Sequence, residues 1–124
     1  MIPPEQIEGK AALFVEFEDR LTILDTLIFC RFYRDFYTWD QLEEIVHTIS
    51  GLEAGKDFLK EIAGNVANLV RRFNLREGMT PEDEKLPRAL YRELKDSGKV
   101  ITEEEMNTMM KEYYQLHGWG KDFA

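Results

Sequence analysis

The sequence predicts an all-α fold, a single compact helical bundle of about four to six helices that forms one domain over residues 1–124. Three observations support this prediction. Apolar residues recur at three- and four-residue spacing in several segments, which is the period of one helix face. Two of these segments follow a threonine that has Gln or Glu three residues later, as in a capping box. Glycines follow the segments, where helices commonly end in a left-handed residue.

The first expected helix starts near Gly9 and extends through Ile28. Its apolar residues are dense on nearly all sides, which predicts a central position in the fold. The stretch LFVEF alternates apolar and polar residues, so a strand is the alternative for part of this segment.

The second expected helix follows Thr38, which is spaced to form a capping box with Gln41, and it ends at Gly51. The third is the longest expected helix and covers about residues 56–75. Gly78 is placed to close it in a left-handed conformation.

A short helix is expected to start at Thr80, and residues 95–101 read as a turn-rich connection. The last expected helix begins at Thr102, which is spaced to form a capping box with Glu105. Gly118 is expected to end this helix.

Composition narrows the classes of partner. The 16 basic and 24 acidic residues give a net charge of −8, which disfavours nucleic acid and anionic membranes as main partners. One cysteine excludes an internal disulfide and suits a reducing, cytoplasmic location. The N-terminal residues show no secretory signal pattern, and no uncharged apolar stretch approaches about 18 residues, so no membrane span is expected.

Cys30 is the residue that most needs an explanation. It lies in the apolar stretch LDTLIFCRF, five residues after Asp25. Taken alone, a free cysteine is most often a small buried apolar residue. A nucleophilic role requires a base, and neither His47 nor His117 is close to Cys30 in sequence. A zinc site requires several nitrogen or sulfur ligands, so the chain is not expected to hold one alone, and a site shared with another polypeptide stays open.

Two further clusters have alternative interpretations. Arg71, Arg72 and Arg76 are expected to pair with nearby carboxylates, as in Arg76–Glu77. The alternative is a basic patch that docks another domain or an anionic cofactor. The aromatic residues of EYYQLHGWG, at 112–120, are expected to pack against one another and the core, with polar tips at the rim.

Three stretches can also be read together. In chain order they are EGKAALFVEF with LDTLIFCRF, then NLVRRFNLREGMTPEDEKLPRAL, then MKEYYQLHGWG. They resemble the C-terminal part of the tungsten-containing aldehyde:ferredoxin oxidoreductase family over nearly the whole chain. The family pattern is approximately GKA, D-x-x-G-L-C-K-F, R-x-F-N-x-R-E-G with D-D-x-L-P-x-R, and Y-Y-x-L-R-G-W-D. This chain differs from it at Ile28-Phe29, where the family has Gly-Leu, and at His117, where the family has Arg.

The resemblance implies roles for three residues. Cys30 matches the family cysteine that is the fourth ligand of a [4Fe–4S] cluster, and Asp25 matches an aspartate that contacts pterin. Phe29, directly before Cys30, joins them as an implied cofactor-binding residue. In such an enzyme, tungsten held by two pterin dithiolenes oxidises an aldehyde to a carboxylate, and electrons pass through the cluster to ferredoxin.

The resemblance also implies that this chain is one part of a larger site. The family's other three cluster cysteines and its pterin-binding domain lie upstream, outside these 124 residues. We therefore expect the isolated chain to hold neither cluster nor tungstopterin and to be inactive. Its expected partner is the upstream N-terminal portion, or a separate subunit, of the same enzyme.

Two other interpretations stay open. One is a non-catalytic helical interaction module that retains the fold without cofactors, and the other is a decayed gene product. If the cofactor face is uncovered, an exposed apolar patch is expected around residues 27–32, with self-association through it.

Overall fold

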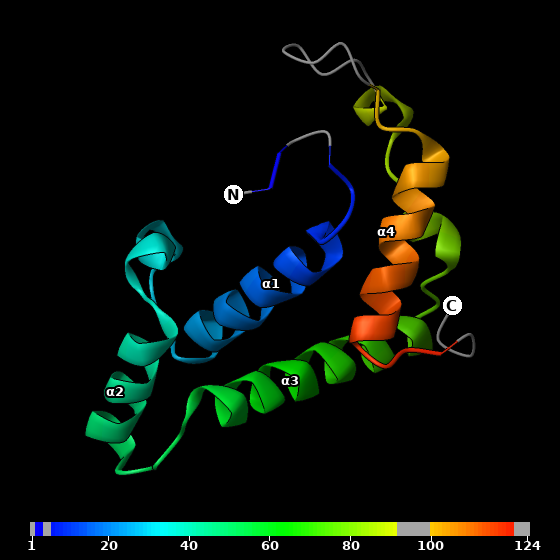
Figure 1. The fold of residues 1–124 in the computed structure, drawn as a ribbon. Coiled ribbons are helices and arrows are strands. Elements are labelled where there is room, and N and C mark those ends of the chain that lie inside the picture. The colour runs from blue at the N-terminus through cyan, green and yellow to red at the C-terminus, as the bar shows by residue number, and fades with distance from the viewer. Residues whose placement is uncertain (1, 4–5, 92–99, 121–124) are drawn as a thin grey trace. The chain divides into compact units, whose positions relative to one another are not determined.

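The computed structural model describes residues 2–3, 6–91 and 100–120 and is drawn in Figure 1. These residues contain no strand, so the all-α prediction is confirmed. The expected connection at 95–101 lies largely outside the described residues. Of the helices among the described residues, none is long and apolar enough to cross a membrane. The α-helices are α1 (Lys10–Thr26), α2 (Trp39–Ser50), α3 (Lys56–Arg76) and α4 (Glu103–Leu116), and the 3-10 helices are η1 (Arg31–Phe36), η2 (Pro81–Glu84) and η3 (Arg88–Leu90).

Contacts group the chain into two compact units. One consists of residues 16–72, and the other of residues 1–15 together with 73–124. α1 and α3 each contribute residues to both units. The expectation that residues 1–124 form one domain stays a prediction.

The starts of α2 and α4 follow the predicted capping boxes. The Gln41 side chain accepts a hydrogen bond from the Thr38 N–H at 2.9 Å, and the Thr38 hydroxyl accepts one from the Gln41 N–H at 3.4 Å. Thr102 and Glu105 make the same reciprocal pair before α4, at 2.9 and 3.1 Å. Each pair satisfies backbone donors that the first turn of a helix leaves free.

Three α-helices end in the same hydrogen-bonded turn, in which a left-handed residue follows the helix. In α3 that residue is Gly78 (φ 96°), and the next N–H, of Met79, donates to the carbonyl of Asn74 at 3.0 Å. α4 ends in the same way at Gly118 (φ 68°). In α1 the left-handed position is taken by Ile28 instead of glycine.

α1 is helical throughout Lys10–Thr26, so the helix expected here is confirmed and no part of LFVEF adopts the alternative strand conformation. The expected extension of α1 through Ile28 was wrong, because the chain turns at Ile28 and returns Phe29 to the core. The predicted central position applies to its second half, where Ile23 and Leu24 are buried, whereas Phe14 in its first half is more than half exposed.

The hydrophobic core lies in the unit of residues 16–72, and α1, α2 and α3 all contribute to it. Leu24 and Leu42 are its largest fully buried side chains. Because the core is small, each large side chain supplies a substantial share of the packing. The buried members are Ile23, Leu24, Trp39, Leu42, Ala54, Leu59 and Ala63.

A polar network at Glu16 links the same three helices. The Glu16 carboxylate of α1 accepts hydrogen bonds from the Trp39 indole N–H of α2, at 2.5 Å, and from the Lys60 ammonium of α3. The Lys56 ammonium lies 3.8 Å from the same carboxylate. The hydrogen bond from Lys60 lowers the pKa of Glu16, against an opposing effect of partial desolvation. Glu16 is therefore an anion that fixes the positions of three elements around Trp39.

Replacing Leu42 tests the position of this core. Leu42→Ala should lower the free energy of unfolding by about 2–5 kcal/mol, because it leaves a cavity where a fully buried side chain was packed. Ile49 lies on the same helix but is 74% exposed, so Ile49→Ala should change stability by less than about 0.5 kcal/mol. Urea unfolding followed by far-UV circular dichroism measures both. Equal losses from the two variants would contradict this core.

Candidate functional site

The residues implied by the sequence lie at one end of α1. Asp25 is in the last turn of the helix, and Phe29 and Cys30 follow the turn of Leu27 and Ile28 at its end. η1 then continues toward α2 and is drawn in cyan in Figure 1. We call residues 28–36 the Cys30 loop.

The loop begins with a left-handed turn at Ile28 (φ 60°), the one non-glycine residue with positive φ in the described ranges. Its N–H donates to the Asp25 carbonyl at 3.0 Å, and the N–H of Phe29 donates to the Leu24 carbonyl at 2.8 Å. These are the hydrogen bonds of a glycine-type helix end. A left-handed backbone costs an L-residue about 1–2 kcal/mol, and β-branched residues adopt it rarely. Because the Ile28 side chain is 92% exposed, little packing offsets this cost.

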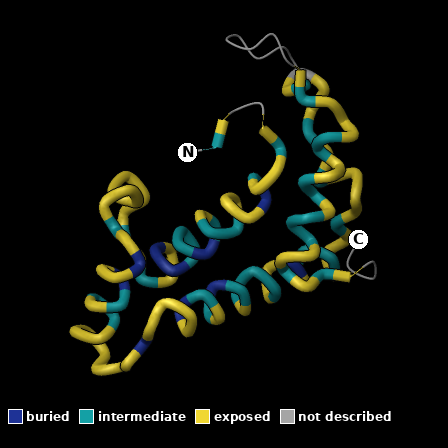
Figure 2. The backbone as a smooth tube through the Cα atoms, viewed as in Figure 1, coloured by how far each residue is buried: buried dark blue, intermediate teal, exposed yellow. Residues whose placement is uncertain are grey.

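Two stacked rings close the base of the loop. The rings of Phe29 and Tyr37 lie 5.2 Å apart between centroids, with planes 28° apart. Both side chains pack against the core. Between them, every residue from Cys30 to Phe36 is exposed, as Figure 2 shows for η1. The loop therefore projects from a fixed base.

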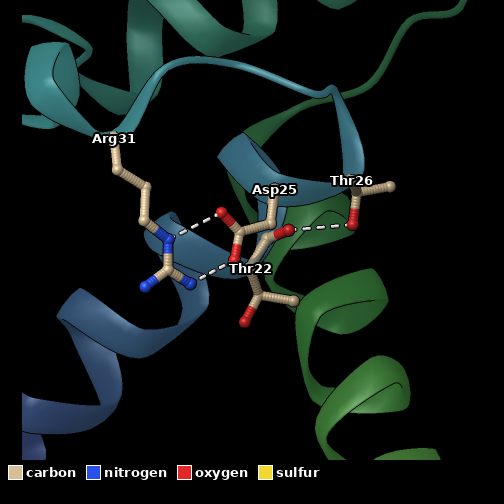
Figure 3. Close-up of polar contacts among 4 residues, drawn as sticks. All are labelled: Thr22, Asp25, Thr26 and Arg31. Atoms are coloured by element: carbon tan, nitrogen blue, oxygen red, sulfur yellow. Dashed lines mark hydrogen bonds and ion pairs between the residues drawn. The ribbon is translucent and has the colours of Figure 1, made fainter.

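Arg31 ties the loop back to α1 through a two-pronged ion pair with Asp25 (Figure 3). Its Nε donates to Asp25 Oδ1 at 2.8 Å, and its Nη2 donates to Oδ2. The hydrogen bond from Arg31 lowers the pKa of Asp25, despite some desolvation. Asp25 is therefore a carboxylate at neutral pH, and its oxygens keep lone pairs that can accept further hydrogen bonds. Beside it, the Thr26 hydroxyl donates to the Thr22 carbonyl at 2.8 Å.

The Cys30 thiol is exposed, so the burial expected for an isolated free cysteine was wrong. The reason is local: Phe29 turns toward the core, and Cys30 precedes η1 with extended backbone angles (φ −71°, ψ 121°). Its carbonyl accepts a hydrogen bond from the Tyr33 N–H at 3.1 Å. In the ranges that the structure describes, no three His, Cys, Asp or Glu side chains are grouped so that they could hold a metal ion. The thiol is thus available to a site only as a single ligand.

The Cys30 loop also exposes large apolar side chains. Ile28 and Phe32 are 92% and 88% exposed, so the predicted apolar patch is confirmed at these positions. Leu27 and Phe29 were expected in the same patch but pack against the core instead. Phe36, which lies beyond the predicted range, is also exposed (70%). The sequence signal for this exposed position is the aromatic-rich stretch RFYRDF, which continues past the predicted range.

The two other clusters of the sequence have mainly structural contacts. Arg76 pairs with Glu77 at 3.0 Å, as predicted. The rings of Tyr113 and Trp119 meet edge to face at 5.5 Å between centroids, as expected for mutual packing. The Tyr114 hydroxyl, a polar tip of the same cluster, hydrogen-bonds a carboxylate of η2.

Comparison with known proteins identifies what the chain is similar to. A family model described as aldehyde ferredoxin oxidoreductase, domains 2 and 3, matches residues 1–122. Tungsten-containing aldehyde ferredoxin oxidoreductases of Thermococcus kodakarensis and Pyrococcus abyssi are 28% and 27% identical to it over 128 residues, and that of Pyrococcus furiosus is 28% identical over 126 residues. Each match covers 98% of this chain and 20% of the relative, so the chain spans about a fifth of the relatives' length. No solved structure matches the chain.

Exchanging the left-handed residues of α1 and α3 tests the strain at Ile28. Ile28→Gly should raise the free energy of unfolding by about 1 kcal/mol, because glycine adopts positive φ without a steric cost. Gly78→Ile should lower it by a similar amount, since a Cβ at Gly78 meets no atom within 4 Å and adds only strain. Denaturant unfolding of both variants gives the two values. A destabilised Ile28→Gly chain would show that the isoleucine contributes more packing than strain.

Titration of Asp25 tests the ion pair. Its pKa should lie below the ordinary value of about 3.9 and should rise toward that value in Arg31→Gln. Because the pKa is lower in the folded chain than in the unfolded one, the pair stabilises the fold above the unfolded-state pKa. This contribution is lost as the pH falls through the folded-state pKa. The pair is exposed and screened by solvent, so its contribution to stability should be small. NMR titration of the Asp25 carboxyl measures the shift, and an unchanged value in Arg31→Gln would contradict it.

Proposed function

Since the chain belongs to the aldehyde ferredoxin oxidoreductase family, we propose that it forms the C-terminal helical part of a tungstopterin and [4Fe–4S] enzyme. The complete enzyme would oxidise aldehydes to carboxylates and pass the electrons to ferredoxin. This chain would contribute residues to the cofactor site and would be inactive alone. The observation that supports this role best is the exposed Cys30 thiol on a loop whose base is fixed.

Cys30 is proposed as one thiolate ligand of the cluster. A [4Fe–4S] cluster is held by four thiolates, and the chain has one cysteine, so the chain cannot hold a cluster by itself. An accessible thiol does fit a shared site in which another polypeptide supplies the other three. The cluster, when bound, would carry the electrons, and Cys30 would fix one corner of it.

Asp25 is proposed to accept hydrogen bonds from the N–H groups of a pterin ring. The ion pair with Arg31 keeps the carboxylate charged and oriented, which supports an acceptor role. Phe29 is proposed as the third cofactor-site residue. Because its ring stacks on Tyr37, its contribution would be to fix the position of the adjacent Cys30.

A non-catalytic interaction module is the second candidate function. It is favoured by one observation, the exposure of large apolar side chains over the Cys30 loop. Such a module would bind its partner in the same way without iron or tungsten. Metal content therefore separates the two proposals.

Co-expression tests the ligand roles. This chain is expressed with a polypeptide of the same genome that carries the other three cluster cysteines (the three-cysteine motif), and the purified complex is assayed for metals. Cys30→Ser should lose most of the iron of the native complex, because serine replaces a thiolate ligand. Ile49→Ser, at an exposed site on α2, is the control and should keep the iron.

The same complex tests Asp25. Asp25→Asn should lower the tungsten content, because the amide removes a charged acceptor and breaks the ion pair with Arg31. Asp35→Asn makes the same change on η1 and should keep the tungsten. Equal iron in Cys30→Ser and native complexes would refute the cluster role, and a native complex without metals would favour the interaction module.

A further inference from the structure

The Cys30 loop holds an apolar side chain in an unfavourable backbone conformation and leaves it in solvent. Ile28 has φ 60° and is 92% exposed, so its side chain contributes little to the packing of residues 16–72. Strained backbone conformations occur mainly at functional sites, so the one at Ile28 suggests that this position has a function. Phe32 and Phe36 on η1 are also 88% and 70% exposed, so the loop presents three large apolar side chains to solvent.

We propose that Ile28, Phe32 and Phe36 form a docking surface for the polypeptide that corresponds to the remaining four-fifths of the relatives, with Ile28 as its anchor. This inference rests on the proposed function. The chain spans only 20% of the relatives' length, which leaves most of such an enzyme to another segment or subunit. Cys30 lies between Ile28 and Phe32 in the loop. A polypeptide that brings three thiolates to Cys30 must therefore approach these side chains.

A second copy of this chain is the competing occupant. Each copy has a net charge of −8, so two copies repel each other at long range. A second copy would also add only one cysteine, and the pair would hold two of the four thiolates that a cluster requires. Both arguments favour the remaining part of the enzyme over a homodimer.

Ile28→Gly distinguishes a loss of docking from damage to the fold. It should raise the free energy of unfolding but lower the affinity for the partner. The substitution relieves the strain and should stabilise the chain, yet it removes the proposed anchor. A few anchor residues near the centre of an interface carry most of its affinity, so losing the proposed anchor should weaken binding tenfold or more. A variant that is more stable but associates less cannot be explained by damage to the fold.

The test measures association in cells and in solution without the cofactors. The chain is co-expressed with the polypeptide that carries the three-cysteine motif, in tungsten-free medium with iron chelated, and binding is measured by co-purification and titration. Ile28→Gly and Phe32→Ala should each weaken association at least tenfold. Ile49→Ala truncates another exposed isoleucine, on α2 (74% exposed), and should leave association unchanged.

Three results would overturn the docking surface. The first is that Ile28→Gly binds the partner polypeptide with native affinity. The second is that the native chain associates only with itself, as measured by light scattering. The third is that the native chain binds neither. Cys30→Ser distinguishes this inference from the proposed cluster role. It should associate as the native chain does and lose iron in metal-replete cells. Iron retained in Cys30→Ser would remove the ligand role and leave the docking surface standing.

Discussion

The turn at Ile28 is the constraint on which the functional part of this structure depends. Two backbone hydrogen bonds end α1 there and reverse the chain, so that Phe29 returns to the core and Cys30 faces outward. Without that reversal, the helix would continue and place Phe29 and Cys30 on different faces of one more turn. The family pattern has glycine at this position, which meets the same backbone requirement without strain. This chain keeps the backbone geometry and adds a side chain to it.

Below the loop, two kinds of contact keep its base in place. Apolar packing among α1, α2 and α3 fixes the end of α1, and the Glu16 carboxylate links the same helices through Trp39 and Lys60. The apolar packing and the Glu16 contacts together hold both ends of the Cys30 loop in place. η1, which forms most of the loop, has no buried residue. The buried residues that stabilise this unit are thus distinct from the exposed residues of η1.

Local signals were sufficient to predict most helix boundaries. The capping boxes at Thr38 and Thr102 and the left-handed glycines at Gly78 and Gly118 depend on residues a few positions apart, and each was read correctly from sequence. The end of α1 could not be read in this way, because its left-handed residue is an isoleucine, which local rules place inside a helix or strand. The exposure of Cys30 was missed for a related reason. Burial depends on where the neighbouring Phe29 packs, and that is a tertiary property.

The candidate site was predicted only as far as its residues are neighbours in sequence. Asp25, Phe29 and Cys30 were expected together, but the partner of Asp25 was not, because nothing in the spacing distinguishes Arg31 from a solvated arginine. The aromatic residues of η1 are close together in the sequence, but their exposure could not be predicted from it. They are exposed because the whole loop projects from the core.

The stacked pair of Phe29 and Tyr37 affects how much conformational entropy would be lost when a partner binds the loop. Residues 30–36 form a closed loop whose ends are already joined in the folded chain, so the entropy of loop closure is lost during folding. A partner that binds this loop then has to order only side chains and a few backbone torsions. Surfaces that are preorganised in this way retain more of their contact energy as affinity. The stack would therefore lower the entropic cost of binding at the loop, even though its two rings lie at the base of the loop.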